Sequence, residues 1–391
     1  NLYVYAAGGG IHGVSTAYYL AQLGVRSVII EQTQIAAAAS GKSGGFLARE
    51  WGSGPTVQLH HKSYDLHQQL ALDLSVTSYR QVDTLEVNGS KKGSNIAGWL
   101  DKKVSSSFMD KSTAQVTPKE LTDKMLTAAT AKMIDGAAAV EVLLDAAVGV
   151  ERSANAQGTL AVVGVKTRCH GIIPTDKVIL CLGPWSGVAV EDWFQLPLPM
   201  DGVKSTSLVF SGLQPVAQEP FACFCEEDAN HCHLELYPRP NGDLYICGCG
   251  GSDHVSGDRL RPGGDCAEAD LVLADARRVQ AACASLRSMT SIVPDGTEPD
   301  VAQACMRPCT PDGLPVMGAV PGTEGAFVSC GHNCWGILWA PVCGLAMAEL
   351  VAFGAARTVD LAAFAPARYM TAVVGTSRGR KKGSVCVGEQ W

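Results

Sequence analysis

The sequence lacks an apolar run that is long and uniform enough to cross a lipid bilayer. The best candidate, residues 336–348, is short, contains Pro341 and is interrupted by Glu349, whereas a spanning helix needs about 20 mostly apolar residues. We therefore expect a buried helix there. The sequence begins at Asn1 and not at methionine, so either a targeting segment has been removed or the chain is a fragment.

An excess of positive charge, a cysteine framework and internal repeats are also missing. A net charge of −7 argues against nucleic acid or an anionic membrane as the main partner. The 15 cysteines are scattered over 391 residues, unlike those of a small disulfide-rich domain. We expect two domains and a reducing compartment, with an organelle matrix (mitochondrion or plastid) favoured and the cytoplasm as the alternative.

What the sequence does contain is a G-x-G-x-x-G pattern directly after the apolar run 2–7. Gly8 permits a tight turn, Gly10 allows the backbone to approach a pyrophosphate, and Gly13 allows a helix to pack closely on a strand. The following residues, 14–21, are typical of a helix, whose amino-terminal end would face the phosphate charge.

A second apolar run, residues 25–30, ends on Glu31. Strand, glycine turn, helix, strand and acid together form a complete mononucleotide-binding unit, and Glu31 is placed to accept hydrogen bonds from a ribose diol. The alternative is an ordinary strand–helix–strand turn that is rich in glycine. We interpret the pattern as a dinucleotide site.

The chain predicts an α/β protein, α+β overall, with a discontinuous Rossmann-type domain and an inserted mixed or antiparallel sheet. We assign residues 1–51, 113–200 and 301–370 to the nucleotide domain. Residues 52–112 and 201–300 would form a substrate domain, and residues 371–391 a basic tail.

Three local expectations follow from the same pass along the chain. Thr117, Pro118 and Glu120 form a helix-start signature with a capping box. Residues 140–150 are typical of a strand, and residues 267–289 of a helix.

A second glycine-rich signature lies near the carboxyl end, where residues 307–318 are followed by 331–336, Gly-His-Asn-Cys-Trp-Gly. This pair resembles the closing flavin-binding region of the D-amino-acid oxidase, glycine oxidase and sarcosine oxidase superfamily. Within it, the chain is most similar to the TDA-type and FOXRED-like FAD-dependent oxidoreductases. Residues 39–48, 182–186 and 235–240 support the resemblance, which covers nearly the whole chain in colinear order.

The resemblance implies a Rossmann-type fold with FAD as cofactor. The implied FAD-binding residues are Gly8, Gly10, Ile11, His12, Gly13, Glu31, Ser40, Gly41, Lys42, Ser43, Gly44, Gly45, Val148, Gly183, Trp185, Arg307, Asp312, Gly331, His332, Asn333, Trp335, Gly336 and Ile337. A helix beginning after Gly331 would direct backbone N–H groups at the flavin ring and stabilise its reduced form; a turn packed for steric reasons is the alternative.

Four residues are candidates for the substrate side. Arg49 could hold a substrate carboxylate through its planar guanidinium, or it could be a surface arginine. Tyr237 and Arg239 lie two residues apart and would share one face of a strand. His332 is a flavin neighbour by resemblance; it would be either an acid–base group or a structural histidine.

Cys305 has the spacing at which sarcosine oxidases attach FAD covalently, a reaction that needs a thiolate; a merely buried cysteine is the alternative. Residues 223–225, 231–233 and 247–249 carry further cysteines and histidines, but C-x-C is not the usual zinc spacing, and we predict no metal.

The preferred function is oxidation of a C–N bond in an amino- or imino-acid-like small molecule, with oxygen or another acceptor reoxidising the flavin. The sarcosine oxidases carry a lysine after the Gly-His step, yet none lies between Gly331 and Gly344. A second hypothesis is therefore an FAD-containing subunit or assembly factor of a larger complex. A nicotinamide dehydrogenase is the least favoured, since the closing motif is of the flavin type.

Overall fold

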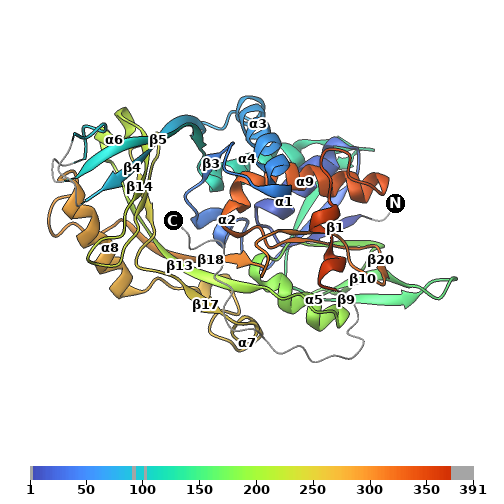
Figure 1. Ribbon diagram of the computed structural model, residues 1–391. Helices are drawn as coiled ribbons and strands as arrows, with labels where there is room; N and C mark the ends of the chain where they lie inside the picture. Colours follow the sequence, from blue (N-terminus) through green and yellow to red (C-terminus); the bar gives the residue numbers. More distant parts are fainter. Residues whose placement is uncertain (1–2, 90–93, 101–103, 371–391) are drawn as a thin grey trace.

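The computed structural model describes residues 3–89, 94–100 and 104–370. The predicted tail, 371–391, lies outside the described residues. In Figure 1 the elements that carry the two glycine turns, β1, α1 and α9, lie on the right, and most strands of a second, larger sheet lie on the left. The domain boundaries given above stay a prediction.

The first region is built around a six-stranded sheet. Its order is β19 (Val316–Ala319), β21 (Ala326–Cys330), β12 (Lys177–Leu180), β1 (Val4–Ala7), β2 (Ser27–Glu31) and β8 (Val140–Leu144). All neighbours pair in parallel except β19 and β21. The central strands are continuous apolar runs because both faces of the sheet are covered.

Helices cover one face of this sheet, and a second, smaller sheet covers the other. The helices are α1 (Ile11–Gln22), α3 (Val57–Asp73), α4 (Pro118–Ala131) and α9 (Gly336–Phe353). The opposite face packs against helix α5 (Ser186–Phe194) and a sheet of β9 (Ala147–Ala154), β10 (Leu160–Thr167), β11 (Gly171–Pro174) and β20 (Thr323–Glu324). Layers on both sides leave the strand ends as the accessible part of this sheet.

The second region is a nine-stranded mixed sheet. Its strands are β3 (Phe46–Ala48), β4 (Arg80–Asn88), β5 (Ser105–Gln115), β13 (Asp201–Phe210), β14 (Phe221–Cys225), β15 (Glu235–Pro238), β16 (Leu244–Cys247), β17 (Asp253–Val255) and β18 (Val301–Cys309). Helix α8 (Ala276–Met289) and the short α6 (Gln214–Gln218) pack on its outer face. Its inner face is left for the site.

Smaller elements complete the chain. They are α2 (Ala39–Lys42), α7 (Gly257–Leu260), the pair β6 (Met133–Ile134) and β7 (Ala137–Ala138), and the 3-10 helices η1 (Gly54–Thr56), η2 (Gly183–Trp185), η3 (Ala269–Leu271), η4 (Asn333–Trp335), η5 (Ala362–Phe364) and η6 (Pro366–Arg368).

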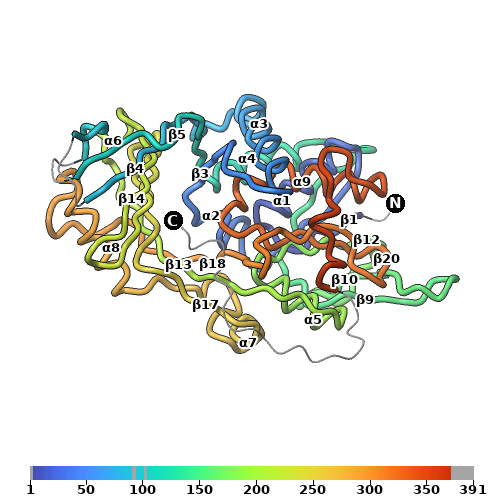
Figure 2. The backbone as a smooth tube through the Cα atoms, in the orientation of Figure 1, coloured from blue at the N-terminus to red at the C-terminus, as the bar shows by residue number. Residues whose placement is uncertain are grey.

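Strands β13 and β18 connect the two regions. They pair antiparallel along their length, from Asp201↔Cys309 to Val209↔Val301, and Figure 2 shows them running side by side from the large sheet toward the glycine turns. This ladder brings residues of β18 to the cavity from the substrate side.

Helix α9 is longer than expected, because it runs through both Pro341 and Glu349. Pro341 cannot bond to the carbonyl of Ile337, but the buried His67 donates to that carbonyl through Nε2 at 3.0 Å. The Glu349 carboxylate accepts the backbone N–H groups of Arg357 and Thr358 at 2.6 and 2.8 Å. Contacts with other parts of the chain therefore satisfy the Ile337 carbonyl and the Glu349 carboxylate, and the helix continues through both Pro341 and Glu349.

By length and composition Asn333–Phe353 could also cross a membrane, yet 72% of its apolar window is buried inside the protein. The expected burial of this helix is confirmed.

Three local predictions need correction. The run 140–150 forms two strands in different sheets, because Asp145 turns the chain and its carboxylate accepts the N–H groups of Ala146 and Cys169. Helix α8 begins only at Ala276, where the Asp275 side chain caps it. Thr117 makes no cap hydrogen bond, since the Glu120 carboxylate instead accepts backbone N–H groups of the turn at residues 77–78.

Candidate functional site

A cavity of about 1300 Å³ lies between the carboxyl ends of β1, β2 and β12 and the inner face of the nine-stranded sheet. Binding pockets for small molecules usually measure about 300–1,000 Å³, so this one has room for a dinucleotide and a substrate together. The carboxyl ends of a parallel sheet are also where doubly wound proteins bind nucleotides.

The first glycine turn has the tight geometry expected from the sequence. Gly8 has a φ of 109°, and a Cβ atom there would lie 2.4 Å from the carbonyl oxygen of Cys181. A Cβ on Gly13 would lie 2.0 Å from the carbonyl oxygen of Gly8. Side chains at these two positions would force β1, β12 and α1 apart.

Polar side chains fix the turn from the next two segments. Ser40 Oγ accepts the backbone N–H of Ile11 at 2.9 Å, in the first turn of α1. Glu31, at the end of β2, accepts the N–H of Gly9 at 2.7 Å and that of Thr33 at 3.1 Å. Glu31 lines the cavity, which is the position that contact with a ribose requires.

The second glycine turn faces the same cavity from β21. Gly331 has a φ of 74° and is followed by His332, η4 and the start of α9. His332, Asn333, Trp335, Gly336 and Ile337 all line the cavity. Two helix amino-terminal ends, those of α1 and η4–α9, therefore present backbone N–H groups and positive dipole ends to one space.

His12 and His332, one from each turn, stack on each other. Their ring centroids are 3.5 Å apart and the rings are inclined by 13°. Burial lowers the pKa of His12 to about 3, against an opposing effect of the nearby Gly336 backbone. Burial and, secondarily, the neighbouring His12 lower the pKa of His332 well below its usual value. Both imidazoles are therefore neutral at physiological pH.

The opposite wall consists of side chains from the nine-stranded sheet. Strand registers pair Glu235 with Cys247 and Tyr237 with Tyr245, and alternation along a strand places such partners on one face. Phe224, Cys305 and Arg307 line the cavity from β14 and β18. Tyr237 donates its hydroxyl to Glu235 Oε2 at 2.5 Å, and the Cys247 thiol lies 3.3 Å from the same oxygen.

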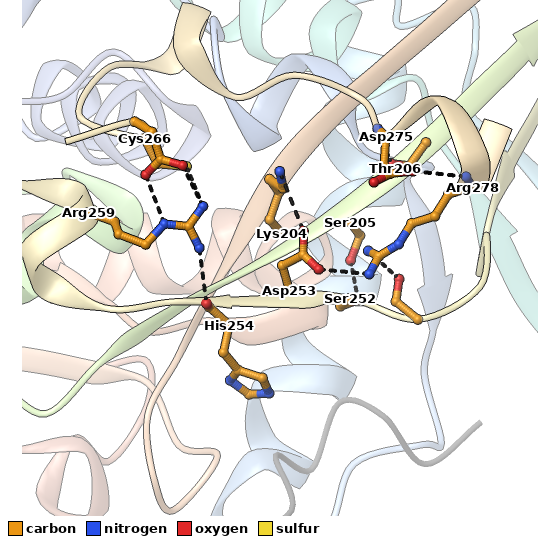
Figure 3. Close-up of polar contacts among 12 residues, drawn as sticks. Lys204, Ser205, Thr206, Ser252, Asp253, His254, Arg259, Cys266, Asp275 and Arg278 are labelled. Atoms are coloured by element: carbon orange, nitrogen blue, oxygen red, sulfur yellow. Dashed lines mark hydrogen bonds and ion pairs between the residues drawn. The ribbon is translucent and has the colours of Figure 1, made fainter.

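Arg307 enters this wall from β18 and is held by two serines. Its guanidinium donates to Ser252 Oγ at 3.2 Å and, more weakly, to Ser205 Oγ at 3.5 Å, while the two hydroxyls lie 2.7 Å apart. The loop that carries Ser252 is anchored in turn, because Arg278 of α8 donates to Asp253 at 2.8 Å and to the Gly251 carbonyl at 2.9 Å (Figure 3). A guanidinium oriented in this way can bind a carboxylate through two parallel hydrogen bonds.

Most of the predicted site residues line the cavity. Those that do so are Gly8, Gly10, Ile11, His12, Glu31, Ser40, Ser43, Gly44, Gly45, Val148, Gly183, Trp185, Tyr237, Cys305, Arg307, His332, Asn333, Trp335, Gly336 and Ile337. Gly331 forms the second turn itself. The two halves of the cofactor prediction, about 300 residues apart, thus meet in space.

Besides Gly331, six predicted site residues do not line the cavity: Gly13, Gly41, Lys42, Arg49, Arg239 and Asp312. Gly13 packs against the Gly8 carbonyl and Gly41 against that of Ala36. Lys42 ends α2, and its backbone carbonyl accepts a hydrogen bond from Gln303 at 3.1 Å. These three residues therefore pack against the backbone of the turn segments or hold it by a hydrogen bond, outside the cavity lining.

The other three are engaged in ion pairs. The Arg49 guanidinium lies 2.7 Å from Glu50 and 3.2 Å from Asp65, so its proposed contact with a substrate carboxylate is not supported. Strand β15 ends at Pro238, and the chain turns at Arg239, which lies 3.9 Å from Asp243. Arg239 therefore does not continue the strand face of Tyr237.

Asp312 serves its own loop. Its carboxylate pairs with Arg368 at 2.8 Å and accepts the N–H of Leu314. Arg368 is one of the groups that lower the pKa of Asp312 to about 2, against the effect of burial.

Cys305 lines the cavity, but burial raises the pKa of its thiol. This disfavours the thiolate that covalent attachment to a flavin needs, and the attachment stays a prediction. Among the described residues, no group of three or more cysteine, histidine or acidic side chains is arranged to hold a metal ion.

Sequence reasoning missed Glu235, Ser205 and Ser252. Glu235 could have been found, because it lies two residues from Tyr237 on a strand already singled out and therefore shares its face. The serines carry no such signal; they meet only because β13 and the end of the 248–252 loop lie together beside β18.

A flavin dinucleotide fits these residues. Two helix amino-terminal ends and the small residues Ser40, Ser43, Gly44 and Gly45 border one side of the cavity. A Cβ on Gly44 would lie 2.4 Å from the ring of Tyr237. Ser43 Oγ and His332 Nε2 are buried there and have no hydrogen-bond partner among the described residues. Such polar atoms, turned toward a dinucleotide-sized space, suit a polar ligand.

Curated relatives agree with this picture. An oxidoreductase of Schizosaccharomyces pombe, C1F5.03c, is 25% identical over 391 residues, covering 90% of this chain and 95% of its own. Glycine oxidase of Pseudomonas putida is 28% identical over 211 residues, 52% of this chain and 49% of its own length. The oxidoreductase TDA3 of Saccharomyces cerevisiae is 25% identical over 51% of this chain and 36% of its own.

Solved structures share the fold. L-Amino acid deaminase from Proteus myxofaciens, in complex with anthranilate, superposes with a TM-score of 0.75 at 17% identity, covering 95% of this chain and 94% of the other. The model of the family described as "FAD dependent oxidoreductase" matches residues 7–350, a span that includes both glycine turns and the sheet face between them. The chain therefore belongs to the family of FAD-dependent oxidoreductases, and FAD is its cofactor.

Proposed function

We propose that this enzyme oxidises the C–N bond of a small amino- or imino-acid-like molecule. The observation that carries the proposal is a single cavity that joins the two glycine turns to the oriented guanidinium of Arg307. Glycine oxidase and L-amino acid deaminase, to which the chain is similar, act by name on substrates that carry a carboxylate and an amine.

Arg307 would bind the substrate carboxylate. Its guanidinium donates hydrogen bonds to the hydroxyl groups of Ser205 and Ser252, which help to orient it. A carboxylate in this position would gain charge-assisted hydrogen bonds from the guanidinium. Arg49 cannot do the same, because it is paired with Glu50 and Asp65 outside the cavity lining.

The cofactor would be held by the two glycine turns, with Glu31 toward the ribose and residues 331–337 toward the ring. When bound, the flavin supplies the acceptor for the hydride that leaves the substrate carbon. His12 and His332 would stay neutral beside it, since burial lowers the pKa of both. Neither histidine would therefore act as a permanently charged acid.

The test is anaerobic mixing of the holoenzyme with a panel of amino and imino acids while absorbance near roughly 450 nm, the oxidised-flavin region, is followed. Bleaching by at least one member is expected. Failure of every tested amine or imino acid to bleach the flavin would contradict the proposal. If the protein were then recovered from native extracts in a stable stoichiometric complex, the accessory-subunit hypothesis would replace it.

A further inference from the structure

We propose that Glu235 forms a cation-binding subsite, so that the substrate carries a second positive group at the end of an apolar chain, as in a diamino or guanidino acid. This inference rests on the proposed function, whose substrate class it narrows.

The side-chain carboxylate of Glu235 can bind a cation. It is half-buried on β15 and lines the cavity. One carboxylate oxygen, Oε2, contacts the Tyr237 hydroxyl and the Cys247 thiol. Burial above all raises the pKa of both donors well above their usual values, so both keep the protons with which they contact this oxygen.

Among the described residues Glu235 forms no ion pair and no histidine contact; its charge acts at longer range on Arg307, whose pKa it helps to raise. Glu227, another carboxylate of the cavity, differs in this respect, since it contacts His231 at 3.1 Å and His233 at 3.5 Å. A half-buried carboxylate with no cation in direct contact favours a ligand that brings one.

The strand order separates the backbones of Glu235 and Arg307 within the sheet. Arg307 lies on β18 and Glu235 on β15, and strands β13 and β16 lie between them in the sheet. Neighbouring strands are about 4.8 Å apart, so a substrate whose carboxylate binds Arg307 would reach Glu235 with a second group on the far side of its carbon chain.

The wall beside Glu235 is aromatic. The rings of Phe46 and Tyr237 stack with centroids 5.4 Å apart, and those of Tyr237 and Tyr245 with centroids 6.1 Å apart. Aromatic faces accept methylene groups and also attract cations. The substrate carboxylate would thus contact Arg307, its apolar chain would contact the aromatic rings, and its distal cation would contact Glu235.

The distal group suits Glu235 better than the reacting amine does. An amine must be unprotonated for its carbon to release hydride, whereas a fixed carboxylate stabilises the protonated form. A lysine ε-ammonium or a guanidinium stays positive throughout the reaction and suffers no such conflict.

The experiment compares lysine with norleucine, which has the same chain without the ε-ammonium, each as the D and the L form. Holoenzyme is titrated for flavin spectral shifts, which report binding, and for anaerobic bleaching, which reports turnover. We expect lysine to exceed norleucine by at least about 10-fold in affinity and in kcat/KM, since hydrogen bonds between charged groups contribute about 1.5–3 kcal/mol.

Glu235→Gln should remove this preference and leave the norleucine values within about 3-fold, because only the charge is lost. Glu235→Asp, which keeps the charge, should restore part of the preference and guards against misfolding of the first variant. Glu86→Gln, an exposed carboxylate of the same sheet that does not line the cavity, is the matched control and should keep the preference intact.

The outcomes separate this inference from the proposed function. If neutral amino acids bleach the flavin as well as lysine does, and E235Q changes nothing, the subsite is contradicted while the oxidation stands. If no compound bleaches the flavin but lysine shifts its spectrum and E235Q abolishes the shift, the subsite stands and the oxidation falls. Absence of both signals overturns both.

Discussion

The two walls of the cavity are built on different principles. The cofactor wall consists mainly of backbone: two glycine turns, two helix amino-terminal ends, and side chains such as Ser40 and Glu31 that hold backbone N–H groups. The substrate wall consists of side chains from strands far apart in the sequence, among them Glu235, Cys247 and Arg307. Backbone chemistry is the same for every relative, whereas side chains can change one at a time, so specificity is expected to vary on the second wall.

The largest effect should be the loss of FAD caused by a side chain at Gly13, in the cofactor wall. In Gly13→Val the new Cβ would lie 2.0 Å from the Gly8 carbonyl oxygen, so α1 must move away from β1 and the turn must open. We expect purified protein without bound FAD, measured by absorbance and by FAD titration.

The control for that variant is Gly89→Ala, since a Cβ at Gly89 would have no neighbour within 4 Å. It should retain a full complement of FAD. If the Gly13→Val protein were purified yellow and bound FAD with normal affinity, the turn would accommodate a side chain at this position and the prediction would be wrong.

Next in size is a break confined to the substrate wall. Arg307→Met should lower kcat/KM for an amino acid that reduces the flavin by about 10–100-fold, because hydrogen bonds between charged groups contribute about 1.5–3 kcal/mol. FAD content should stay complete, which steady-state kinetics and absorbance together would establish.

Arg49→Gln distinguishes the arginine expected from the sequence from the one found in the cavity. Arg49 lies in an exposed ion-pair cluster, and its loss should change kcat/KM by less than about 3-fold, because exposed ion pairs are worth at most about 1 kcal/mol. If Arg49→Gln lowered kcat/KM more than Arg307→Met does, Arg49 would be the residue that binds the carboxylate.

The stability of the folded protein should depend on pH because of the stacked histidines, His12 and His332. The pKa of His12 is lowered from 6.5 to about 3 in the folded protein, so below pH 6.5 the unfolded chain binds a proton that the folded protein refuses. Stability is then complete above pH 6.5 and falls as the pH decreases, by about 1.4 kcal/mol per pH unit for each such histidine.

Urea unfolding of the FAD-free protein between about pH 7 and pH 5 would measure that slope. His12→Gln should unfold with a shallower pH dependence, since one of the two stacked groups no longer titrates. An unchanged slope would mean that other groups control the acid sensitivity.

The smallest effect concerns the cap of α1. Ser40→Ala removes the acceptor for the Ile11 N–H and should cost about 0.5–2 kcal/mol of stability, the usual range for a lost amino-terminal cap. Thermal melting would detect it, with Ser112→Ala, at an exposed strand position, as the comparison. Equal melting temperatures would show that the hydroxyl does not support the turn.

Much of the cofactor wall could be predicted because its signals are local. A glycine that must adopt a positive φ, a helix that follows directly and an acid at the end of the next strand all lie within residues 8–31. The closing turn at residues 331–336 is equally local. The resemblance to a flavoprotein family joined these two signals, although contact between them, as in the stack of His12 on His332, depends on the six-stranded sheet order.

The sequence by itself determined a dinucleotide site and the overall class of fold, because short-range sterics and hydrophobic periodicity encode both, whereas FAD as the cofactor followed from the resemblance to a flavoprotein family. Only the tertiary structure decided which arginine lines the cavity, that Glu235 forms no ion pair with the described residues, and how α9 accommodates Pro341 and Glu349. These features depend on strand register and on contacts between distant segments, and the free energy that selects them is a property of the whole packed molecule.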